Sequence, residues 1–283
     1  MKNTLSQSDQ RLSQQVENLL VERNLRGMQT IQPLLQSGYC ARAAQLLLNL
    51  DGKVLIGTGF PVNSTFETDG PVGAIALYQA LEHLNAEPIL VCGNPLFTAV
   101  KDHYNAVQLT VGDLDNAKQE SLKILAQLQP QAVISIERAG MTANGRFFNM
   151  RGEDISDRCA CFDYFMSQSQ CPSIGIGDGG NEIGMGNIHQ RLSHLNIVPS
   201  ITTCTELVIA DVSNWAAYGI ILFLQRWTGK PLLEQINPKE IIRFLSNKGS
   251  VDGVTRENTM TEDGLCYSEG EALLSELILM ANR

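Results

Sequence analysis

Residues 53–93 read KVLIGTGFPVNSTFETDGPVGAIALYQALEHLNAEPILVCG. Two short apolar runs, Val54–Ile56 and Pro88–Cys92, flank a segment in which apolar side chains recur at helical spacing. Strands that alternate with helical segments are typical of parallel sheets, because parallel neighbours need a long crossover connection. The stretch therefore predicts two parallel strands joined by a helix.

The same alternation continues along the chain. Further apolar runs cover residues 107–110, 132–136, 173–176 and 207–210. Helices are expected near residues 72–84, 117–128, 182–195 and 214–227. Continuous apolar strands indicate a sheet that is buried on both faces. We therefore predict an α/β fold with a mostly parallel sheet and helices on both faces, in a Rossmann-like three-layer arrangement.

The first fifty residues differ from the rest because they read as helical throughout. Leu12, Val16, Leu19 and Leu20 recur at helical spacing, and a second apolar helix covers about residues 41–48. No repeat, low-complexity stretch or charged linker divides the chain further. The sequence predicts a helical N-terminal extension over residues 1–50 and one α/β domain over residues 51–283.

Composition narrows the class of partner. The chain has 283 residues, a formal charge of −9 and 43% hydrophobic residues. A nucleic-acid site needs a basic face, and a membrane span needs a longer apolar run than this chain contains. Seven scattered cysteines indicate no disulfide framework and fit a reducing cytoplasm. We expect a cytoplasmic protein with a small-molecule ligand, no nucleic-acid or membrane partner, and a homodimer from the prevalence of symmetric dimers.

Ligands of open α/β sheets bind at the carboxyl ends of the strands, so the loops there are the candidate sites. After the first strand come Glu67, Asp69 and Gly70, followed by Pro71, which suits the first position of a helix. One interpretation is that Asp69 and Gly70 only start that helix. The other is that Glu67 and Asp69 face a ligand at its N-terminus.

A second candidate follows the strand at residues 132–136. Glu137 comes directly after that strand, and a long polar segment covers residues 141–157. Guanidinium groups suit carboxylates because their planar fork donates two parallel hydrogen bonds. The candidate ligand-binding residues here are Arg138, Arg146, Asn149 and Arg151. The alternative is an arginine–carboxylate network that only fixes the loop.

The third candidate is the segment GIGDGGNEIGMGN at residues 175–187. Its many glycines indicate tight turns or a close approach to a ligand. It matches G-x-G-x-x-G, but Asp178 and Glu182 put negative charge where a pyrophosphate would lie. At a helix N-terminus these carboxylates favour the ionised form and suit an ammonium group or a divalent metal. Simple capping by Asp178 or Asn181 is the alternative.

Six motifs together resemble the C-terminal domain of the D-glutamate cyclase family. They are ETDGP at 67–71, IERAG at 136–140, NMRGEDIS at 149–156, GIGDGGNEIGMG at 175–186, DVSNW at 211–215 and GVTREN at 253–258. The resemblance runs from about residue 57 to the end. It implies a hydro-lyase that converts D-glutamate to 5-oxo-D-proline and water.

That reaction needs cations for two substrate carboxylates, a base and an acid. Arg138, Arg146 and Arg151 are expected to bind the carboxylates, and Arg256 is a further candidate. Asp178 is a fair base or ammonium partner, whereas Glu137, behind an apolar strand, is the expected acid, with Glu182 as a third catalytic candidate. The remaining expected substrate contacts are Asn149, Asn181, Gly179, Gly180, Glu67 and Asp69.

Three alternatives stay open at this point. Mn²⁺ or Mg²⁺ on Asp178 and Glu182 could polarise the carboxyl group instead of a protein acid. The loop at residues 175–186 could be the anion cradle of a nucleotide- or phosphate-using enzyme. The same residues could also form an amino-acid-binding protein without turnover.

Overall fold

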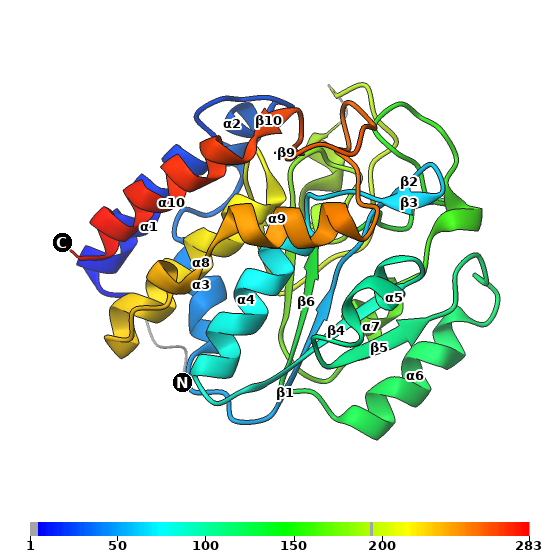
Figure 1. Ribbon diagram of the computed structural model, residues 1–283, viewed down its shortest axis with the longest axis horizontal. Coiled ribbons are helices and arrows are strands. Elements are labelled where there is room, and N and C mark those ends of the chain that lie inside the picture. Colours follow the sequence, from blue (N-terminus) through cyan, green and yellow to red (C-terminus); the bar gives the residue numbers. More distant parts are fainter. Residues whose placement is uncertain (1–4, 193–194, 283) are drawn as a thin grey trace.

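A computed structural model describes residues 5–192 and 195–282, and a six-stranded parallel sheet lies at its centre (Figure 1). The strands are β1 (Lys53–Gly57), β4 (Glu87–Gly93), β5 (Ala106–Leu109), β6 (Ala132–Ile136), β7 (Ser173–Gly177) and β8 (Glu206–Ile209). Each of the six predicted apolar runs forms one of them. Their order is β5-β4-β1-β6-β7-β8, so the chain winds outward from β1 in one direction and then in the other. The point of reversal lies between β1 and β6.

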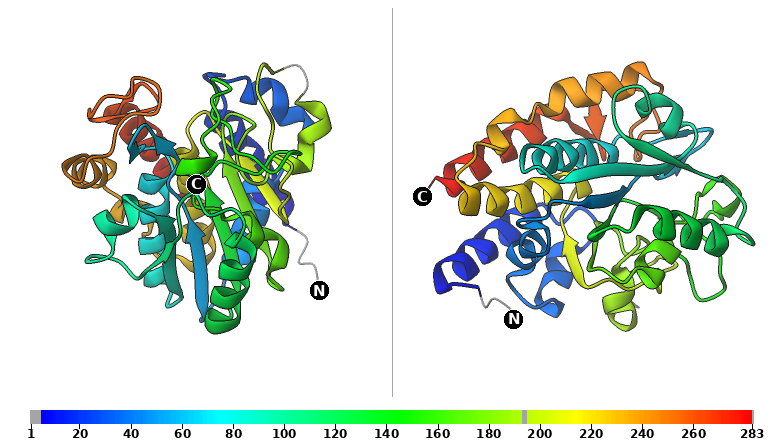
Figure 2. Two further views of the ribbon diagram at one scale, coloured as in Figure 1. Left: turned by 90° about the vertical axis from the view of Figure 1, so that its right-hand side faces the viewer. Right: turned by 90° about the horizontal axis from the view of Figure 1, so that it is seen from below.

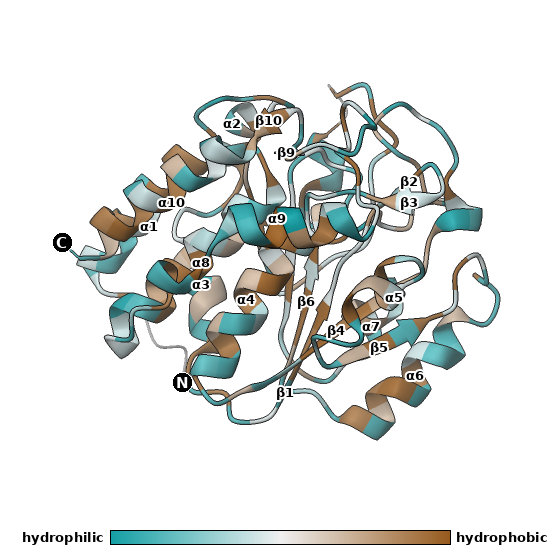
Figure 3. Ribbon diagram, in the orientation of Figure 1, coloured by the Kyte–Doolittle hydropathy of each residue, from teal (hydrophilic) through white to brown (hydrophobic). Residues whose placement is uncertain are grey.

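Helices cover both faces of the sheet, which confirms the predicted three-layer α/β fold (Figure 2). Val54 and Ile56 of β1 belong to the larger core, whereas Leu55 between them belongs to the smaller one. Helices α4 (Pro71–His83) and α8 (Ser213–Thr228) cover the larger core. Helices α6 (Ala117–Leu128) and α7 (Asp163–Gln168) cover the other. Figure 3 shows the apolar strands between these layers.

Helix α8 is apolar on all sides because the protein surrounds it. It packs against the helices α3 (Tyr39–Leu47), α4 and α10 (Tyr267–Ala281) and against strands β6, β7 and β8 of the sheet. Every residue from Ser213 to Gln225 is buried. The chain before β1 is helical as predicted, with α1 (Gln7–Leu20), α2 (Met28–Ile31) and the 3₁₀ turn η1 (Gln32–Leu34). A domain boundary at residue 50 stays a prediction.

The remaining elements are short hairpins, 3₁₀ turns and helices that connect the parts described above. They are the hairpin β2–β3 (Pro61–Val62, Thr65–Phe66), α5 (Leu96–Val100), the 3₁₀ turns η2 (Ser156–Arg158) and η4 (Leu233–Gln235), α9 (Pro238–Asn247) and the hairpin β9–β10 (Thr261–Glu262, Leu265–Cys266). No helix in the described ranges is long and apolar enough to cross a bilayer.

The expected helix at residues 182–195 requires a correction. The structure has the 3₁₀ helix η3 (Met185–Arg191) instead, and residues 193–194 lie outside the described residues. The chain turns through Gly180 and Gly184 with φ of 104° and 102°, so no helix forms before Met185. A Cβ on Gly186 would lie 2.3 Å from the carbonyl oxygen of Ile201, which shows how closely the two segments approach.

Candidate active site

A pocket of about 440 Å³ opens at the carboxyl ends of the strands, where the order of the sheet reverses. This is the place at which doubly wound sheets bind their ligands. Loops from five parts of the chain line it. Its polar lining residues are Arg26, Asn63, Glu67, Glu137, Asn149, Arg151, Glu153, Arg158, Asp178, Asn181, Arg256 and Asp263.

Buried carboxyl groups form one wall of the pocket. Glu67, Glu137 and Asp178 are at most 7% exposed, and Asp263 joins them from the β9–β10 turn. Asp69 does not line the pocket, but its carboxylate adjoins those of Glu137 and Asp178. Carboxylate oxygens of Asp69, Glu137 and Asp178 all lie within 4.8 Å of one another. The structure thus brings together predicted residues from the loops after β1, β6 and β7, and we call these five residues the acidic wall.

Glu137 has an unusual backbone that aims it into the pocket. Its φ is 44°, in the left-handed region that few residues other than glycine adopt. Gly70 permits this turn, because a Cβ there would lie only 2.7 Å from the Cβ of Glu137. The hydroxyl of Ser213 donates to Glu137 Oε2 at 2.6 Å. Ser213 is the first residue of α8, and its hydroxyl holds Glu137 rather than capping the helix.

The helices α4 and α8 begin side by side, and each receives its cap from the other. Asp69 accepts hydrogen bonds from the backbone N–H groups of Ser213 and Asn214 at 2.9 and 2.8 Å. Asn214 Oδ1 accepts from the N–H groups of Gly70 and Gly73 at 2.8 and 2.7 Å. Both helix N-termini therefore face the acidic wall and favour negative charge there. Asp69 does cap a helix, but that helix is α8.

One cation from the N-terminal segment contacts the acidic wall. Arg26 Nη2 forms ion pairs with both Asp178 and Asp263 and donates to the carbonyl oxygen of Asp211 at 3.0 Å. Arg26 and Asp263 were not among the predicted site residues. Neither follows a strand of the sheet, and their proximity to Asp178 exists only in three dimensions.

Burial and neighbouring charges shift the pKa values of the carboxyl groups in the acidic wall, and not all in the same direction. Burial raises the pKa of Glu137 well above its usual range, and the charges of Glu182 and Asp69 raise it further. Burial also raises the pKa of Asp178, although Arg26 opposes this rise. For Asp263, burial acts upward and Arg26 acts downward, and its pKa lies below the ordinary value. The pKa values of these neighbouring carboxyl groups are therefore shifted in opposite directions, upward for Glu137 and downward for Asp263.

The glycine-rich loop after β7 folds around its own carboxylate. Glu182 accepts hydrogen bonds from the N–H groups of Gly179 and Gly180 at 2.9 and 2.7 Å, and it does not line the pocket. Both amides are thereby occupied, as they would be in an anion cradle. Asn181 does line the pocket and donates to the carbonyl oxygen of Phe148 at 3.0 Å. Its buried Oδ1 accepts no hydrogen bond within the described chain.

The predicted arginines lie in different places. Arg151 lines the pocket and donates to the carbonyl oxygen of Val254 at 3.1 Å. Arg256 also lines it and pairs with Glu153 at 2.9 Å. These contacts join the loop at residues 149–153, where Asn149 accepts hydrogen bonds from two backbone N–H groups, to the loop at residues 253–256.

Arg138 and Arg146 are not among the residues that line the pocket. Arg138 is buried and donates to the carbonyl oxygens of Thr58, at 2.6 Å, and Ala160, so it joins loops beneath the pocket. Arg146 is exposed and pairs with Asp154 at 2.6 Å. The expected contact of these two side chains with a substrate stays a prediction that their positions do not support.

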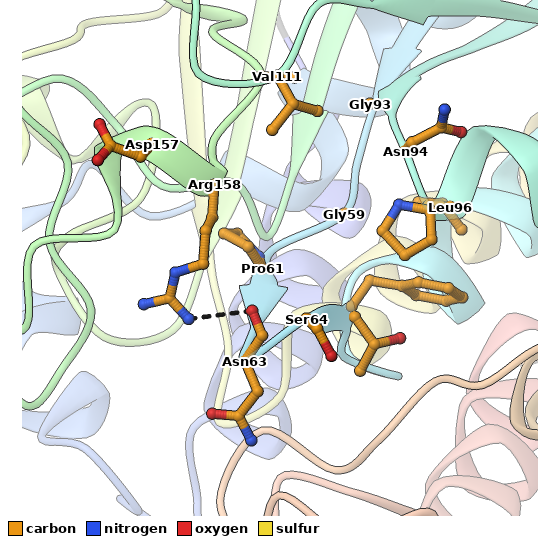
Figure 4. Close-up of a pocket in the computed structure, with 14 residues that line it drawn as sticks. Gly59, Pro61, Asn63, Ser64, Gly93, Asn94, Leu96, Val111, Asp157 and Arg158 are labelled. Carbon is orange, nitrogen blue, oxygen red and sulfur yellow. Dashed lines mark hydrogen bonds between the residues drawn. The ribbon is translucent and has the colours of Figure 1, made fainter.

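Arg158, which the sequence analysis did not single out, lies between two cavities. Its Nη1 donates to the carbonyl oxygen of Asn63 at 3.1 Å (Figure 4). A smaller cavity of about 160 Å³ adjoins the main pocket, and Arg158, Pro61 and Asn63 line both. Arg158 forms no ion pair with any acidic group in the described ranges. Its guanidinium group is therefore available to a ligand carboxylate.

Comparison with known proteins places the chain in one family and gives matches in sequence and in structure. A family model described as "D-glutamate cyclase-like, C-terminal" matches residues 16–278. Human mitochondrial D-glutamate cyclase is 30% identical over 204 residues, which cover 62% of this chain and 33% of that protein. This chain thus spans about a third of that relative's length. The crystal structure of an exopolyphosphatase-related protein from Bacteroides fragilis matches with a TM-score of 0.42 and 13% identity, over 87% of this chain and 57% of that one.

Proposed function

Because the chain belongs to the D-glutamate cyclase-like C-terminal family, we propose that it is a lyase that converts D-glutamate to 5-oxo-D-proline and water. The observation that carries this proposal is the distribution of charge in the pocket. Buried carboxyl groups form one wall, and Arg151, Arg158 and Arg256 stand elsewhere on its lining. An amino acid with one ammonium group and two carboxylates has the complementary pattern.

The reaction needs proton transfer but no oxidant or reductant. The substrate nitrogen attacks the carbon of the γ-carboxyl group, so one C–N bond forms and one C–O bond breaks. The ammonium group gives up two protons in total, and the departing oxygen takes up two and leaves as water. Carboxyl groups whose pKa is raised above the ordinary value suit both tasks, because proton transfer is most effective when the pKa of the group is close to the working pH.

Asp178 and Glu137 fit the two proton-transfer roles. Arg26 contacts Asp178, which favours the carboxylate form that accepts a proton from the ammonium group. Glu137 contacts no cation among the described residues and is held by Ser213, so it keeps its proton and donates it to the departing oxygen. The buried oxygen of Asn181 on the same pocket lining suits the N–H groups of the substrate.

A divalent cation also fits this pocket, although the residues that would bind it differ from the expected pair, Asp178 and Glu182. Asp69, Glu137 and Asp178 would hold Mn²⁺ or Mg²⁺, because their oxygens converge and such hard cations prefer oxygen ligands. The unpartnered oxygen of Asn181 in the same pocket supports this fit. Glu182 is left out, because amides occupy both of its oxygens. When bound, such a cation polarises the γ-carboxyl group.

The first test of this proposal is the variant Asp178→Asn. It keeps the size of the side chain but removes the proton acceptor, so cyclase turnover should fall by about 10²-fold or more. Asp154→Asn is the matched control, because Asp154 is exposed and pairs only with Arg146 among the described cations. Turnover by folded Asp178→Asn within a factor of three of the unmodified protein would show that this pocket is not the site.

A further inference from the structure

The N-terminal segment supplies part of the pocket. Leu25 and Arg26 line it, although they precede the first strand of the sheet by a helix and several turns. Arg26 is the only member of this segment that forms ion pairs with the acidic wall within the described chain. The N-terminal segment therefore contributes a positive charge to the pocket from a part of the chain outside the sheet.

The contacts of Arg26 converge on three oxygens from separate parts of the chain. Nη2 contacts the carboxylates of Asp178, after β7, and Asp263, in the β9–β10 turn, and the carbonyl oxygen of Asp211, after β8. The side chains of Asp178 and Asp263 are only 4% and 7% exposed. Two buried carboxylates that contact the same guanidinium nitrogen repel each other unless that cation compensates their charge.

The backbone that carries Arg26 is itself held in place. The carboxylate of Asp211 accepts hydrogen bonds from the N–H groups of Arg23 and Leu25 at 2.7 and 3.2 Å. The N–H of Asp211 donates to the carbonyl oxygen of Leu20 at 2.7 Å, so the end of α1 is tied to the same residue. Arg26 therefore approaches the acidic wall from a fixed main chain.

We propose that Arg26 is a positioning residue of this site: it holds Asp178 and Asp263 in place on the pocket wall and offsets their charge, so that a substrate of net negative charge can bind there. The inference rests on the proposed function and deepens it, because it makes the N-terminal segment part of the active unit. The side chain acts through the two carboxylates that it contacts.

Kinetics of Arg26 variants test this role. Arg26→Ala should raise the KM for D-glutamate at least tenfold and lower kcat at least tenfold, because Asp178 loses its partner. Arg26→Lys should recover part of both losses, and added methylguanidinium should raise the turnover of Arg26→Ala at least threefold. Arg23→Gln is the control: Arg23 lies in the same segment but pairs with exposed Glu269, and both constants should stay within twofold. Unchanged kinetics of Arg26→Ala, or a loss that neither lysine nor methylguanidinium relieves, would overturn the inference.

A second measurement does not depend on turnover. Arg26→Ala should lower the midpoint of thermal unfolding at pH 7, and Asp263→Asn added to it should restore at least half of that loss, because the uncompensated charge is then gone. Additive effects of the two changes would contradict the inference even in a protein without activity. Non-additive stability together with no turnover of D-glutamate by the unmodified chain would instead remove the proposed function and leave Arg26 as the counter-ion of this pair.

Discussion

Glu137 combines three features at one residue: a left-handed backbone, a buried side chain and a hydrogen bond from Ser213. We predict that Glu137→Gln lowers kcat by about 10²-fold or more, with little change in KM, because the amide cannot donate a proton to the departing oxygen. Steady-state kinetics with D-glutamate measure this. A variant that keeps half of the kcat would assign the acid role elsewhere.

Arg158 is expected to bind a substrate carboxylate without taking part in the proton transfers. We predict that Arg158→Gln raises KM by about tenfold or more and changes kcat less, because a charge-assisted contact is worth roughly 1.5–3 kcal/mol. Arg146→Gln, which removes a charge from the exposed pair with Asp154, should leave both constants unchanged. If Arg146→Gln raises KM and Arg158→Gln does not, then Arg146 and not Arg158 binds the substrate carboxylate.

Glu262, which is buried next to Asp263 of the acidic wall, gives a pH dependence of stability. It accepts hydrogen bonds from Trp215 Nε1 and Asn214 Nδ2, and burial raises its pKa from 4.5 to about 7. The folded protein thus holds a proton that the unfolded chain releases. The stability that this group contributes is complete below pH 4.5 and is lost as the pH rises to about 7.

The variant Glu262→Gln removes that titration. Between pH 4.5 and pH 8, the free energy of unfolding of the unmodified protein should fall relative to the variant by on the order of 3 kcal/mol. Urea unfolding at both pH values measures the difference, and Glu276→Gln, exposed on α10, serves as the control. An equal difference between Glu262→Gln and the unmodified protein at both pH values would contradict this prediction.

At the scale of elements, the mutual caps of α4 and α8 fix the geometry of the site. Asn214→Ala removes the acceptor for two backbone N–H groups of α4 and the donor to Glu262. We predict a loss of about 2–4 kcal/mol in the free energy of unfolding, because buried donors are left unpaired. Asn237→Ala, which removes the exposed cap of α9, should cost only about 1 kcal/mol.

Denaturant unfolding of both variants measures this contrast. The midpoint should move while the slope stays constant, because the change affects stability and not the extent of the folded state. Equal losses for Asn214→Ala and Asn237→Ala would show that the paired caps add nothing beyond one ordinary helix cap.

Elements also show what the sequence predicts well. The six strands are long apolar runs, and the rule that loops at their carboxyl ends carry function located Glu67, Glu137 and Asp178. The same rule does not predict the direction in which each side chain points. Glu137 faces the pocket, whereas the next residue, Arg138, points to carbonyl oxygens beneath it. The glycine content of the loop likewise did not reveal that its backbone N–H groups donate to the carboxylate of Glu182 in the same loop.

At the scale of the whole molecule, the predicted family and the α/β fold are confirmed. The site also needs residues from both ends of the chain. Arg26 and Asp263 meet beside Asp178, and no local pattern in the sequence relates positions so far apart. Whether residues 1–50 form a separate extension stays a prediction, as do the cytoplasmic location, the homodimer and the absence of nucleic-acid partners.

The most direct test of the central claim is a proton NMR time course of the purified protein with D-glutamate and L-glutamate in separate samples, each with and without Mn²⁺ or Mg²⁺. The account predicts that 5-oxoproline resonances grow from D-glutamate and not from L-glutamate, and that Asp178→Asn abolishes them. No 5-oxoproline from D-glutamate under any of these conditions would contradict the proposed cyclisation.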